Sequence, residues 1–406
     1  MKISLRGQSI ISNSTIQIPG SKSETNRLLA LRALYPNIEL QNISDSDDSK
    51  AMIAALENDS EVIDVGHAGT TMRFLTAYYA FQHGRSVTIT GSQRMKQRPI
   101  KILVDALRSL GADITYLENE GFPPLKITGR KPAGNAVTIN SNVSSQYISA
   151  LLLTAPKFAN GLQITLEGEV TSMPYINMTL DMMSQIGIKS MFLGNKITIL
   201  PTLSITGCSF SIESDWSSAS YFYSIIALSP IGTSVTLSRF KRHSFQGDIA
   251  LVEIYKDFGV ETTFENDCIV LTKSADCQLS IVNYQLNQTP DLAQTIAVTA
   301  FGLGLGCELS GLETLKIKET DRLAALKNEF EKLGANVSTT NDSISIAPSA
   351  VIKPNVTIST YDDHRMAMAF APLALKVPVT IENPGVVSKS YPDFWKALRI
   401  LGFKFE

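Results

Sequence analysis

The sequence has few cysteines and histidines, and their positions exclude several classes of protein. Four cysteines, Cys208, Cys268, Cys277 and Cys307, are spread over a chain of 406 residues without paired or metal-type spacing. This pattern predicts free thiols in a reducing compartment rather than a disulfide framework. With four histidines and neither a CxxC nor an HExxH motif, the sequence argues against a catalytic metal, and we expect none.

Long hydrophobic runs, a targeting segment and an excess of charge are absent as well. No apolar run approaches the length that spans a membrane, and the opening residues MKISLRGQSI lack the apolar core of a signal peptide. The formal net charge of −2 differs from the basic excess of nucleic-acid-binding proteins. Neither a phosphate-binding GxxxxGKS/T motif nor a dinucleotide-binding glycine loop after a strand is present. We therefore expect a cytoplasmic protein with no nucleic-acid or membrane partner and no cofactor.

The length and a repeating pattern predict more than one domain. A chain of 406 residues exceeds one ordinary hydrophobic core, so two domains are expected. An amphipathic helix pattern that ends at glycine and continues into short strands occurs five times. The glycines, at spacings of 76, 72, 75 and 68 residues, are Gly111, Gly187, Gly259, Gly334 and Gly402. Glycine directly after a helix is the usual left-handed C-cap.

A second helix pattern, apolar and rich in small residues, repeats in step with the first and predicts buried helices. It starts near Thr70, Ser144, Ser217, Thr289 and Asp363, and SKSETNRLLAL is a sixth example. Six units divide as three plus three, with a boundary near residues 211–216. We therefore expect two similar α/β lobes with buried helices inside and sheets around them. A single array of α/β repeats is the alternative, although solenoid repeats are usually shorter.

Cations stand at the starts of several of these predicted helices, where the helix dipole disfavours them. Lys22 and Arg27 lie in the first helix, Arg73 in the second and Arg365 in the last. Capping explains the hydroxyl and aspartate residues at the helix starts, but it does not explain these cations. Because helix N-termini are anion sites, helix starts that converge between the lobes are expected to bind a polyanion.

Two further basic motifs are each compatible with a site or with an ordinary surface. Lys96 and Arg98 lie in RMKQRP, a predicted loop in which alternating charge is also typical of solvation. Lys318 and Arg322 lie four residues apart in KIKETDRLAAL, on one helical face. Glu319 precedes Arg322 by three residues and can pair with it, so a surface ion-pair ladder is the alternative to a binding site.

Eleven motifs, in register from residue 19 to about residue 394, together resemble those of the enolpyruvyl transferases. They are PGSKSETNR, AGTTMR, RMKQRP, SSQ, SMPY, DWSSASYF, QGD, PD, IKETDRL, DDHRMAM and SKSYPDF. Their order is similar to that of the branch that uses shikimate 3-phosphate. The resemblance implies two inverse α/β barrel lobes of three βαβαββ units each. One lobe is expected to contain residues 14–213 and the other residues 1–13 and 214–406, with the active-site cleft between them.

The resemblance also implies a reaction. The enolpyruvyl group of phosphoenolpyruvate is transferred to the 5-hydroxyl of shikimate 3-phosphate, and phosphate leaves, as a step of aromatic amino acid biosynthesis. Such a transfer requires an acid for the vinyl carbon, a base for the hydroxyl and cationic groups that hold the carboxylate and phosphates. No metal or other cofactor is implied, and the expected partners are these two small anionic substrates.

Matching motif positions imply a role for each candidate residue. Lys22, Asp291 and Glu319 are expected to be catalytic, with Asp291 as the base towards the hydroxyl and Glu319 as the proton donor and acceptor at the vinyl carbon. The expected phosphoenolpyruvate ligands are Lys22, Gly69, Arg98, Gln146, Arg322, Arg365 and Lys389. The expected shikimate 3-phosphate ligands are Lys22, Ser23, Arg27, Ser144, Ser145, Gln146, Ser172, Tyr175, Asp291 and Lys318.

Four positions depart from the common pattern of these transferases. Where relatives often read NAGTAMRP, this chain reads HAGTTMRF, so that His67, Thr71 and Phe74 stand beside the expected phosphoenolpyruvate pocket. Thr314 stands before KETDR, where asparagine is common. The first three positions bear on the affinity for phosphoenolpyruvate and for the inhibitor glyphosate, and Thr314 bears on one hydrogen bond to shikimate 3-phosphate.

Two alternative functions stay open at this point. A sister transferase acts on UDP-N-acetylglucosamine and carries a reactive loop cysteine, whereas SQRMKQRPI has none and every cysteine follows residue 207. The other alternative is a non-catalytic anion-binding protein of the same fold. Asp291 and Glu319 argue against it, because bare anion binding gains nothing from carboxylates in a basic cleft. We expect a monomeric enzyme.

Overall fold

The computed structural model describes residues 1–7, 9–141, 144–168 and 170–406, which divide into two compact units. One unit contains residues 20–212, and the other contains residues 1–19 together with residues 213–406. The division falls at Gly20 rather than at residue 14, because strand β2 (Ser14–Gln17) pairs with a strand of the second unit. The first 19 residues therefore belong, by their contacts, with the C-terminal half of the chain.

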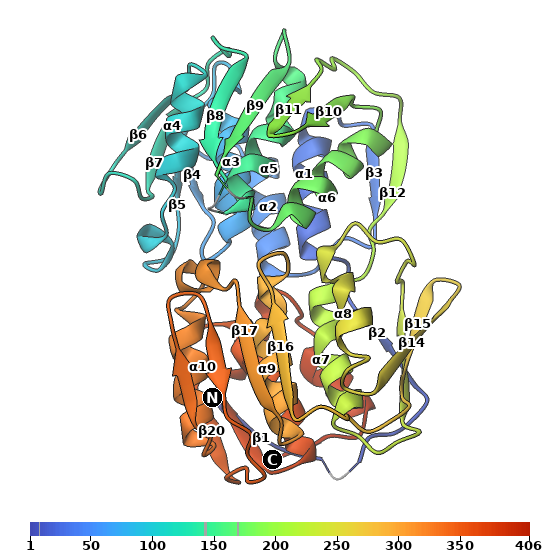
Figure 1. Ribbon diagram of the computed structural model, residues 1–406. Coiled ribbons are helices and arrows are strands. Elements are labelled where there is room, and N and C mark those ends of the chain that lie inside the picture. The colour runs from blue at the N-terminus through green and yellow to red at the C-terminus, as the bar shows by residue number, and fades with distance from the viewer. Residues whose placement is uncertain (8, 142–143, 169) are drawn as a thin grey trace. The chain divides into compact units, whose positions relative to one another are not determined.

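The unit of residues 20–212 alternates helices and strands (Figure 1). Its helices are α1 (Lys22–Leu34), α2 (Asp47–Glu57), α3 (Gly69–Ala80), α4 (Lys101–Ser109), α5 (Ser145–Thr154) and α6 (Met173–Gln185), with 3₁₀ turns η1 (Met95–Gln97) and η2 (Ala155–Lys157). Its strands are β3 (Ile38–Gln41), β4 (Val62–Asp64), β5 (Ser86–Thr90), β6 (Asp113–Tyr116), β7 (Leu125–Thr128), β8 (Ala136–Asn140), β9 (Leu162–Glu167), β10 (Ser190–Leu193), β11 (Lys196–Ile199) and β12 (Cys208–Ser211). They form sheets β4-β5-β7-β6 and β8-β9-β11-β10 and the parallel pair β3-β12.

The unit of residues 1–19 and 213–406 follows the same alternation. Its helices are α7 (Trp216–Ala227), α8 (Leu251–Ile254), α9 (Ala293–Gly302), α10 (Arg322–Lys332), α11 (His364–Phe370) and α12 (Phe394–Ile400), with 3₁₀ turns η3 (Gly247–Ala250), η4 (Pro290–Leu292), η5 (Glu313–Ile317), η6 (Ala371–Leu375) and η7 (Pro384–Lys389). Its strands are β1 (Lys2–Arg6), β2, β13 (Ser234–Ser238), β14 (Val260–Glu265), β15 (Cys268–Lys273), β16 (Ile281–Gln285), β17 (Gly306–Ser310), β18 (Val337–Thr339), β19 (Ile344–Ile346), β20 (Val356–Ile358), β21 (Val379–Glu382) and β22 (Lys404–Phe405). They form sheets β2-β13-β15-β14, β16-β17-β19-β18 and β20-β21-β1-β22.

The four-stranded sheets of the described chain share one topology, which is the structural form of the sequence repeat. In each sheet two parallel strands lie beside an antiparallel hairpin, as β4 and β5 lie beside β6 and β7. The sheet that contains β20 follows the same order, but β1 from the start of the chain takes the third, interior position, antiparallel to both β21 and β22. The prediction of an α/β fold built from repeated units is confirmed.

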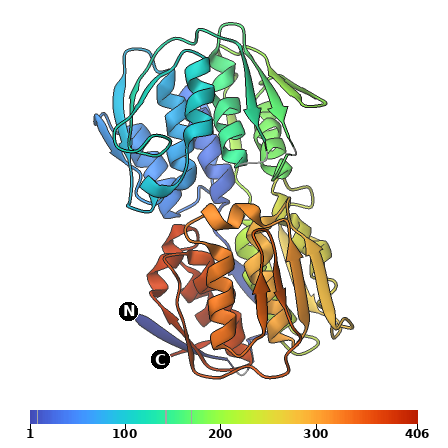
Figure 2. The ribbon, with the colours of Figure 1, turned by 60° about the vertical axis from the view of Figure 1, so that its left-hand side comes forward.

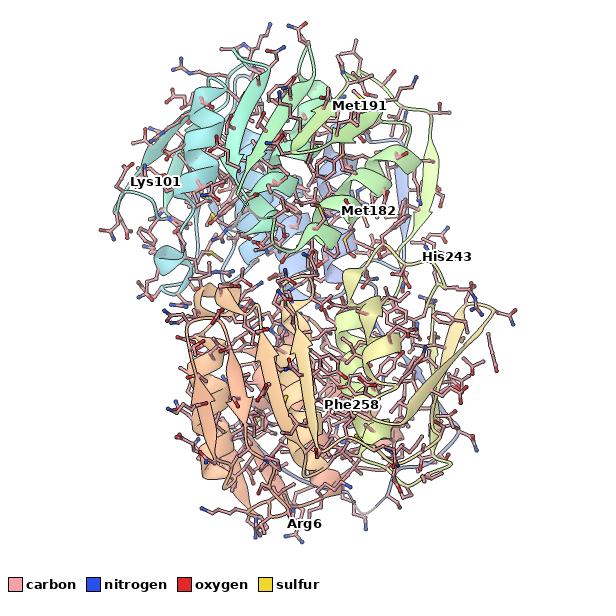
Figure 3. The ribbon with its side chains drawn as sticks, in the orientation of Figure 1. Arg6, Lys101, Met182, Met191, His243 and Phe258 are labelled. Carbon is pink, nitrogen blue, oxygen red and sulfur yellow. The ribbon has the colours of Figure 1, made fainter. Side chains whose placement is uncertain are left out.

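The apolar helices of the repeat form the core of each unit, as predicted. Every residue of α9 and of α11 is buried. In Figure 2 the helices of residues 213–406 lie to one side of the yellow and orange strands. Figure 3 labels Phe258, which is fully buried, and Met191 on the edge strand β10, which is 56% exposed. Buried aromatic residues pack edge to face, as Trp216 does on Phe240 with ring centroids 4.8 Å apart.

The helix ends show which capping predictions hold. The five repeat glycines have positive φ values between 72° and 96°, as a left-handed C-cap requires. Asp363 caps α11, where its Oδ1 accepts a hydrogen bond from the Arg365 backbone N–H at 2.8 Å. The capping predictions for Ser217 and Thr289 are wrong, because Asp215 caps α7 and the Thr289 side chain makes no capping hydrogen bond. The Ser217 hydroxyl therefore serves another partner.

Candidate active site

Arg322, the first residue of α10, has its guanidinium surrounded by three carboxylates. Nε donates to Asp363 Oδ2 at 2.7 Å, Nη1 to Asp291 Oδ1 at 2.9 Å and Nη2 to Glu319 Oε2 at 2.8 Å. Burial alone would lower the pKa of Arg322, but the three carboxylates outweigh burial and raise it. The side chain is only 2% exposed, so the pairing of Glu319 with Arg322 belongs to a buried network and not to a surface ladder.

Asp291, in the turn η4, is paired with three cations. Its Oδ1 faces Arg322 and lies 3.6 Å from Lys318 Nζ, and its Oδ2 accepts from Arg365 Nη2 at 3.0 Å. Burial would raise the pKa of Asp291, but Arg365, Lys318 and Arg322 together hold it well below the usual range. Asp291 is therefore ionised at neutral pH and is a weak base while it is paired. A substrate anion that draws these cations away would make it a stronger base.

Glu319 links Arg322 to a further cation. Its Oε1 lies 3.6 Å from the Nζ atom of Lys389, the last residue of η7, while Oε2 accepts from Arg322. The side chains of Glu319 and Lys389 are 11% and 6% exposed. The structure thus brings together six predicted site residues, here named the charge cluster: Asp291, Lys318, Glu319, Arg322, Arg365 and Lys389.

Sequence reasoning missed the role of Asp248, which extends the charge cluster. The Ser217 hydroxyl donates a short hydrogen bond to Asp248 Oδ2 and accepts one from Arg365 Nη2 at 3.2 Å. Asp248 is 3% exposed, and its Oδ1 atom has no hydrogen-bond partner among the described residues. The motif QGD contains Asp248, but no local pattern pairs it with a serine 31 residues away.

We expect Asp248→Asn to stabilise the protein near pH 7.5 but not near pH 4. Burial, assisted by Asp291, raises the pKa of Asp248 to about 6, although Ser217 and Arg365 oppose the shift. The folded state therefore binds the proton more tightly than the unfolded state, and stability falls as the pH rises from about 4 to about 6. Removing the ionisable group should add about 1–3 kcal/mol at the higher pH. Thermal unfolding at both pH values measures this, with the exposed Asp267→Asn as control, and equal gains at both pH values would contradict it.

In the unit of residues 20–212, Arg27 is buried among neutral acceptors. Its Nε donates to Thr179 Oγ1 at 2.8 Å, and Nη2 donates to Ser149 Oγ at 3.0 Å. Nη1 donates to the carbonyl of Ser23 at 3.0 Å, and Nη2 also reaches the carbonyl of Tyr175 at 3.3 Å. The structure thus brings together three predicted ligands on α1 and α6. It adds Ser149 and Thr179, which no local sequence pattern connects to α1.

Lys22, at the start of α1, pairs with a buried carboxylate that the sequence did not indicate. Its Nζ lies 3.5 Å from Asp48 Oδ1 in the first turn of α2, and Asp48 is 2% exposed. The other oxygen, Oδ2, has no hydrogen-bond partner among the described residues. Thr71, one of the departures, donates to the Asp48 carbonyl at 2.9 Å, and His67 lies 3.7 Å from Asp47. Two departures therefore contact the start of α2.

Lys22→Met should destabilise the unit of residues 20–212 by about 1–3 kcal/mol, because it leaves Asp48 buried without its cation. Adding Asp48→Asn to this variant should restore most of the loss. Chemical unfolding followed by far-UV circular dichroism measures both. Lys50→Met is the matched control, because Lys50 is exposed on α2, the helix that contains Asp48. If the single variant unfolds like this control, Asp48 does not depend on Lys22.

Gly69, the first residue of α3, leaves room for the guanidinium of Arg98. A Cβ atom at Gly69 would lie 2.4 Å from Arg98 Nη1 and 2.9 Å from Cζ, so a larger residue would displace the arginine. Arg98 itself is 7% exposed. Arg73 donates to the carbonyls of Gly69 at 3.2 Å and Pro99 at 2.9 Å. These bonds fasten the backbone beside Arg98 to the start of α3.

The remaining predicted ligands stand at helix starts. Ser144 caps α5, where its Oγ accepts from the Gln146 backbone N–H at 3.4 Å, and Ser145 is the first residue of that helix. Gln146 Nε2 donates to Thr70 Oγ1 at 3.1 Å and so connects α5 with α3. Ser172 precedes α6 with a left-handed φ of 56°. Each of these residues thus lies at or next to the first turn of its helix.

The described residues contain no group of three or more histidine, cysteine or acidic side chains that could hold a metal ion. None of the helices among them is long and apolar enough to cross a membrane. All four cysteines are free thiols.

Thr314, the fourth departure, lies in η5. Its hydroxyl is buried and has no hydrogen-bond partner among the described residues.

Solved structures of EPSP synthases have this fold. Two structures of the enzyme from Acinetobacter baumannii align with TM-scores of 0.80 and 0.78, at 21% sequence identity. Each alignment covers 100% of this chain and 99% of the solved chain. At this identity the likeness defines the class of fold, an α/β fold of two units.

Sequence comparison identifies the family. The sequence profile of EPSP synthase (3-phosphoshikimate 1-carboxyvinyltransferase) matches residues 56–398. A 3-phosphoshikimate 1-carboxyvinyltransferase from Bacteroides fragilis is 48% identical over 394 residues, which cover 96% of this chain and 95% of the relative. One from Aliivibrio salmonicida is 38% identical over 417 residues, covering 95% and 96%. The chain belongs to the EPSP synthase family.

Proposed function

We propose that this protein transfers the enolpyruvyl group of phosphoenolpyruvate to the 5-hydroxyl of shikimate 3-phosphate and releases phosphate. The observation that carries the proposal is the charge cluster, in which Asp291 and Glu319 share the guanidinium of Arg322. Two carboxylates among cations suit a reaction between two anions that also needs an acid and a base. The free cysteines agree with a cytoplasmic location.

In the unit of residues 213–406, each part of the charge cluster has a proposed task. Asp291 accepts the proton of the 5-hydroxyl once its cations turn to the substrates, and Glu319 gives a proton to the vinyl carbon and later removes one. Arg322, Arg365 and Lys389 hold the phosphate and carboxylate of phosphoenolpyruvate, and Lys318 orients shikimate 3-phosphate. The support is the set of ion pairs between these residues, because a bound anion can replace a carboxylate partner without leaving a buried cation unpaired.

In the unit of residues 20–212, the proposed tasks concern anion binding. Arg27 binds shikimate 3-phosphate with Ser23, Ser144, Ser145, Ser172 and Tyr175, and Arg98 binds phosphoenolpyruvate beside Gly69. Lys22 contacts both substrates, as does Gln146. The support is that Arg27 and Arg98 are 2% and 7% exposed and that the hydrogen bonds of the Arg27 guanidinium go to neutral oxygens. Buried cations of this kind are stabilised by a bound anion.

Phosphate release is the direct test of the proposed reaction. The protein is incubated with phosphoenolpyruvate and shikimate 3-phosphate, with each substrate alone, and with phosphoenolpyruvate and UDP-N-acetylglucosamine. We expect release only when phosphoenolpyruvate and shikimate 3-phosphate are present together. Release with the UDP-sugar instead would favour the sister activity. Absence of release from every mixture, with substrate binding retained, would favour a non-catalytic anion-binding protein.

A further inference from the structure

Two aromatic rings lie against the guanidinium of Arg27. The Arg27 Cζ atom lies 5.5 Å from the centroid of the Phe74 ring and 5.7 Å from the centroid of the Tyr175 ring. Phe74 comes from α3 and Tyr175 from α6, so rings from two helices contact one guanidinium on α1. Both distances lie within the range of a cation–π interaction, which strengthens when water is excluded.

The surroundings of Arg27 make these rings important. All four hydrogen bonds of its guanidinium go to neutral oxygens, those of Thr179, Ser149, Ser23 and Tyr175. Burial lowers the pKa of Arg27 to about 10, although Tyr175 and Glu24 oppose the shift. The ring faces therefore supply part of the electrostatic stabilisation that an anionic partner would otherwise give.

Phe74 lies on α3, directly after Arg73. The family resemblance led us to expect Phe74 beside the phosphoenolpyruvate pocket and gave no connection between Phe74 and Arg27. In the structure its side chain is 1% exposed and its ring lies against the arginine expected to bind the other substrate. The alternative is that Phe74 only packs in the core. In that case its replacement would lower stability without a selective effect on the binding of one substrate.

We propose that Phe74 is a positioning residue for shikimate 3-phosphate, because its ring holds the Arg27 guanidinium in the orientation that binds this substrate. The proposal rests on the function proposed above. Loss of the ring removes one of the contacts that fix the guanidinium, while its hydrogen bonds and the contact with Tyr175 remain, so the binding of a substrate then has to order it further. The effect falls on shikimate 3-phosphate and leaves phosphoenolpyruvate, which Arg27 does not bind, nearly unaffected.

The test compares Phe74→Leu with Phe158→Leu. Phe158 is 2% exposed, belongs to the same unit and packs against Phe81 with ring centroids 4.7 Å apart. Its loss therefore removes a similar ring that is not one of the two rings over Arg27. Binding of shikimate 3-phosphate alone is measured by calorimetry, and KM is measured for each substrate by phosphate release. Phe74→Met is measured in parallel, because it retains most of the side-chain volume without a ring.

We expect the Phe74 variants to bind shikimate 3-phosphate about 5- to 30-fold more weakly, with KM for phosphoenolpyruvate changed less than about twofold. Phe158→Leu should lose stability without either change. The inference is overturned if the Phe74 variants bind shikimate 3-phosphate like Phe158→Leu, or if both KM values rise together, which would identify a packing role. Failure of the unaltered protein to bind shikimate 3-phosphate or release phosphate would instead overturn the proposed function, and the inference with it.

Discussion

Arg322→Ala is expected to lower the free energy of unfolding of residues 213–406 by about 3–5 kcal/mol. The substitution leaves Asp363, which is fully buried, and two less buried carboxylates, Asp291 and Glu319, without their shared cation. An unpaired charge in a buried site has lost its hydration without compensation. Both tryptophans of the chain, Trp216 and Trp395, lie in this unit, so the fluorescence change on chemical unfolding reports on it directly.

The matched control for this experiment is Lys327→Ala. Lys327 also lies on α10, but its side chain is 41% exposed and its nearest carboxylate contact is a 3.9 Å surface pair. Such a substitution should change stability by less than about 0.5 kcal/mol. The loss in Arg322→Ala should also shrink in acid, because ion pairing lowers the pKa of Asp291 and its stabilising effect disappears as the pH falls. If Arg322→Ala unfolds like the control, the charge cluster does not hold this unit together.

Glu319→Gln is expected to reduce phosphate release about 100- to 10,000-fold, the usual effect of removing a proton-transfer group. The amide retains the shape of the side chain and an oxygen that can accept from Arg322, so the fold should persist. An amide cannot deliver or remove a proton at the vinyl carbon at neutral pH. Incorporation of solvent deuterium into the methylene group of phosphoenolpyruvate should therefore fall together with phosphate release.

The control for Glu319→Gln is Glu313→Gln, at the exposed start of η5 in the same segment. It removes one negative charge at a similar place in the sequence and should leave turnover unchanged. Binding of phosphoenolpyruvate to Glu319→Gln separates chemistry from affinity, because the loss should appear in kcat. A normal kcat with a raised KM would show that Glu319 orders the cations and transfers no proton.

The architecture was predictable from sequence where one pattern occurs many times. The spacing of the glycines that begins with Gly111 gave the unit length, and the apolar helices in step with them gave the core. The exchange of the first strands between halves of the chain followed only from the family resemblance. Even so, β2 was assigned to the wrong side of the division, because Ser14–Gln17 contains a single apolar residue, Ile16, and nothing in so short a segment indicates which strand it pairs with.

The contacts of the site could be predicted where both residues belong to one motif, and could not be predicted where the two residues are far apart in the sequence. Glu319 and Arg322 lie three residues apart, so their ion pair could be expected. Asp48 and Asp248 contact residues 26 and 31 positions away, and only the three-dimensional fold brings them there. Ser217 was interpreted as a cap because its position is typical of one, yet a neighbouring aspartate is the better acceptor and releases the serine hydroxyl for Asp248.

The interior position of β1 has a consequence for the order in which the chain is made. Its neighbours β21 and β22 are among the last segments to be synthesised, so β1 stays unpaired while residues 20–212 can already fold. Strands so far apart in the sequence pair slowly, because the chain loses the entropy of closing a large loop before the strands gain any hydrogen bonds or packing contacts. Ser4 and Glu406 exchange two backbone hydrogen bonds of 3.0 Å, so a circularly permuted chain that starts at Gly20 would make these strands neighbours in sequence and remove the wait.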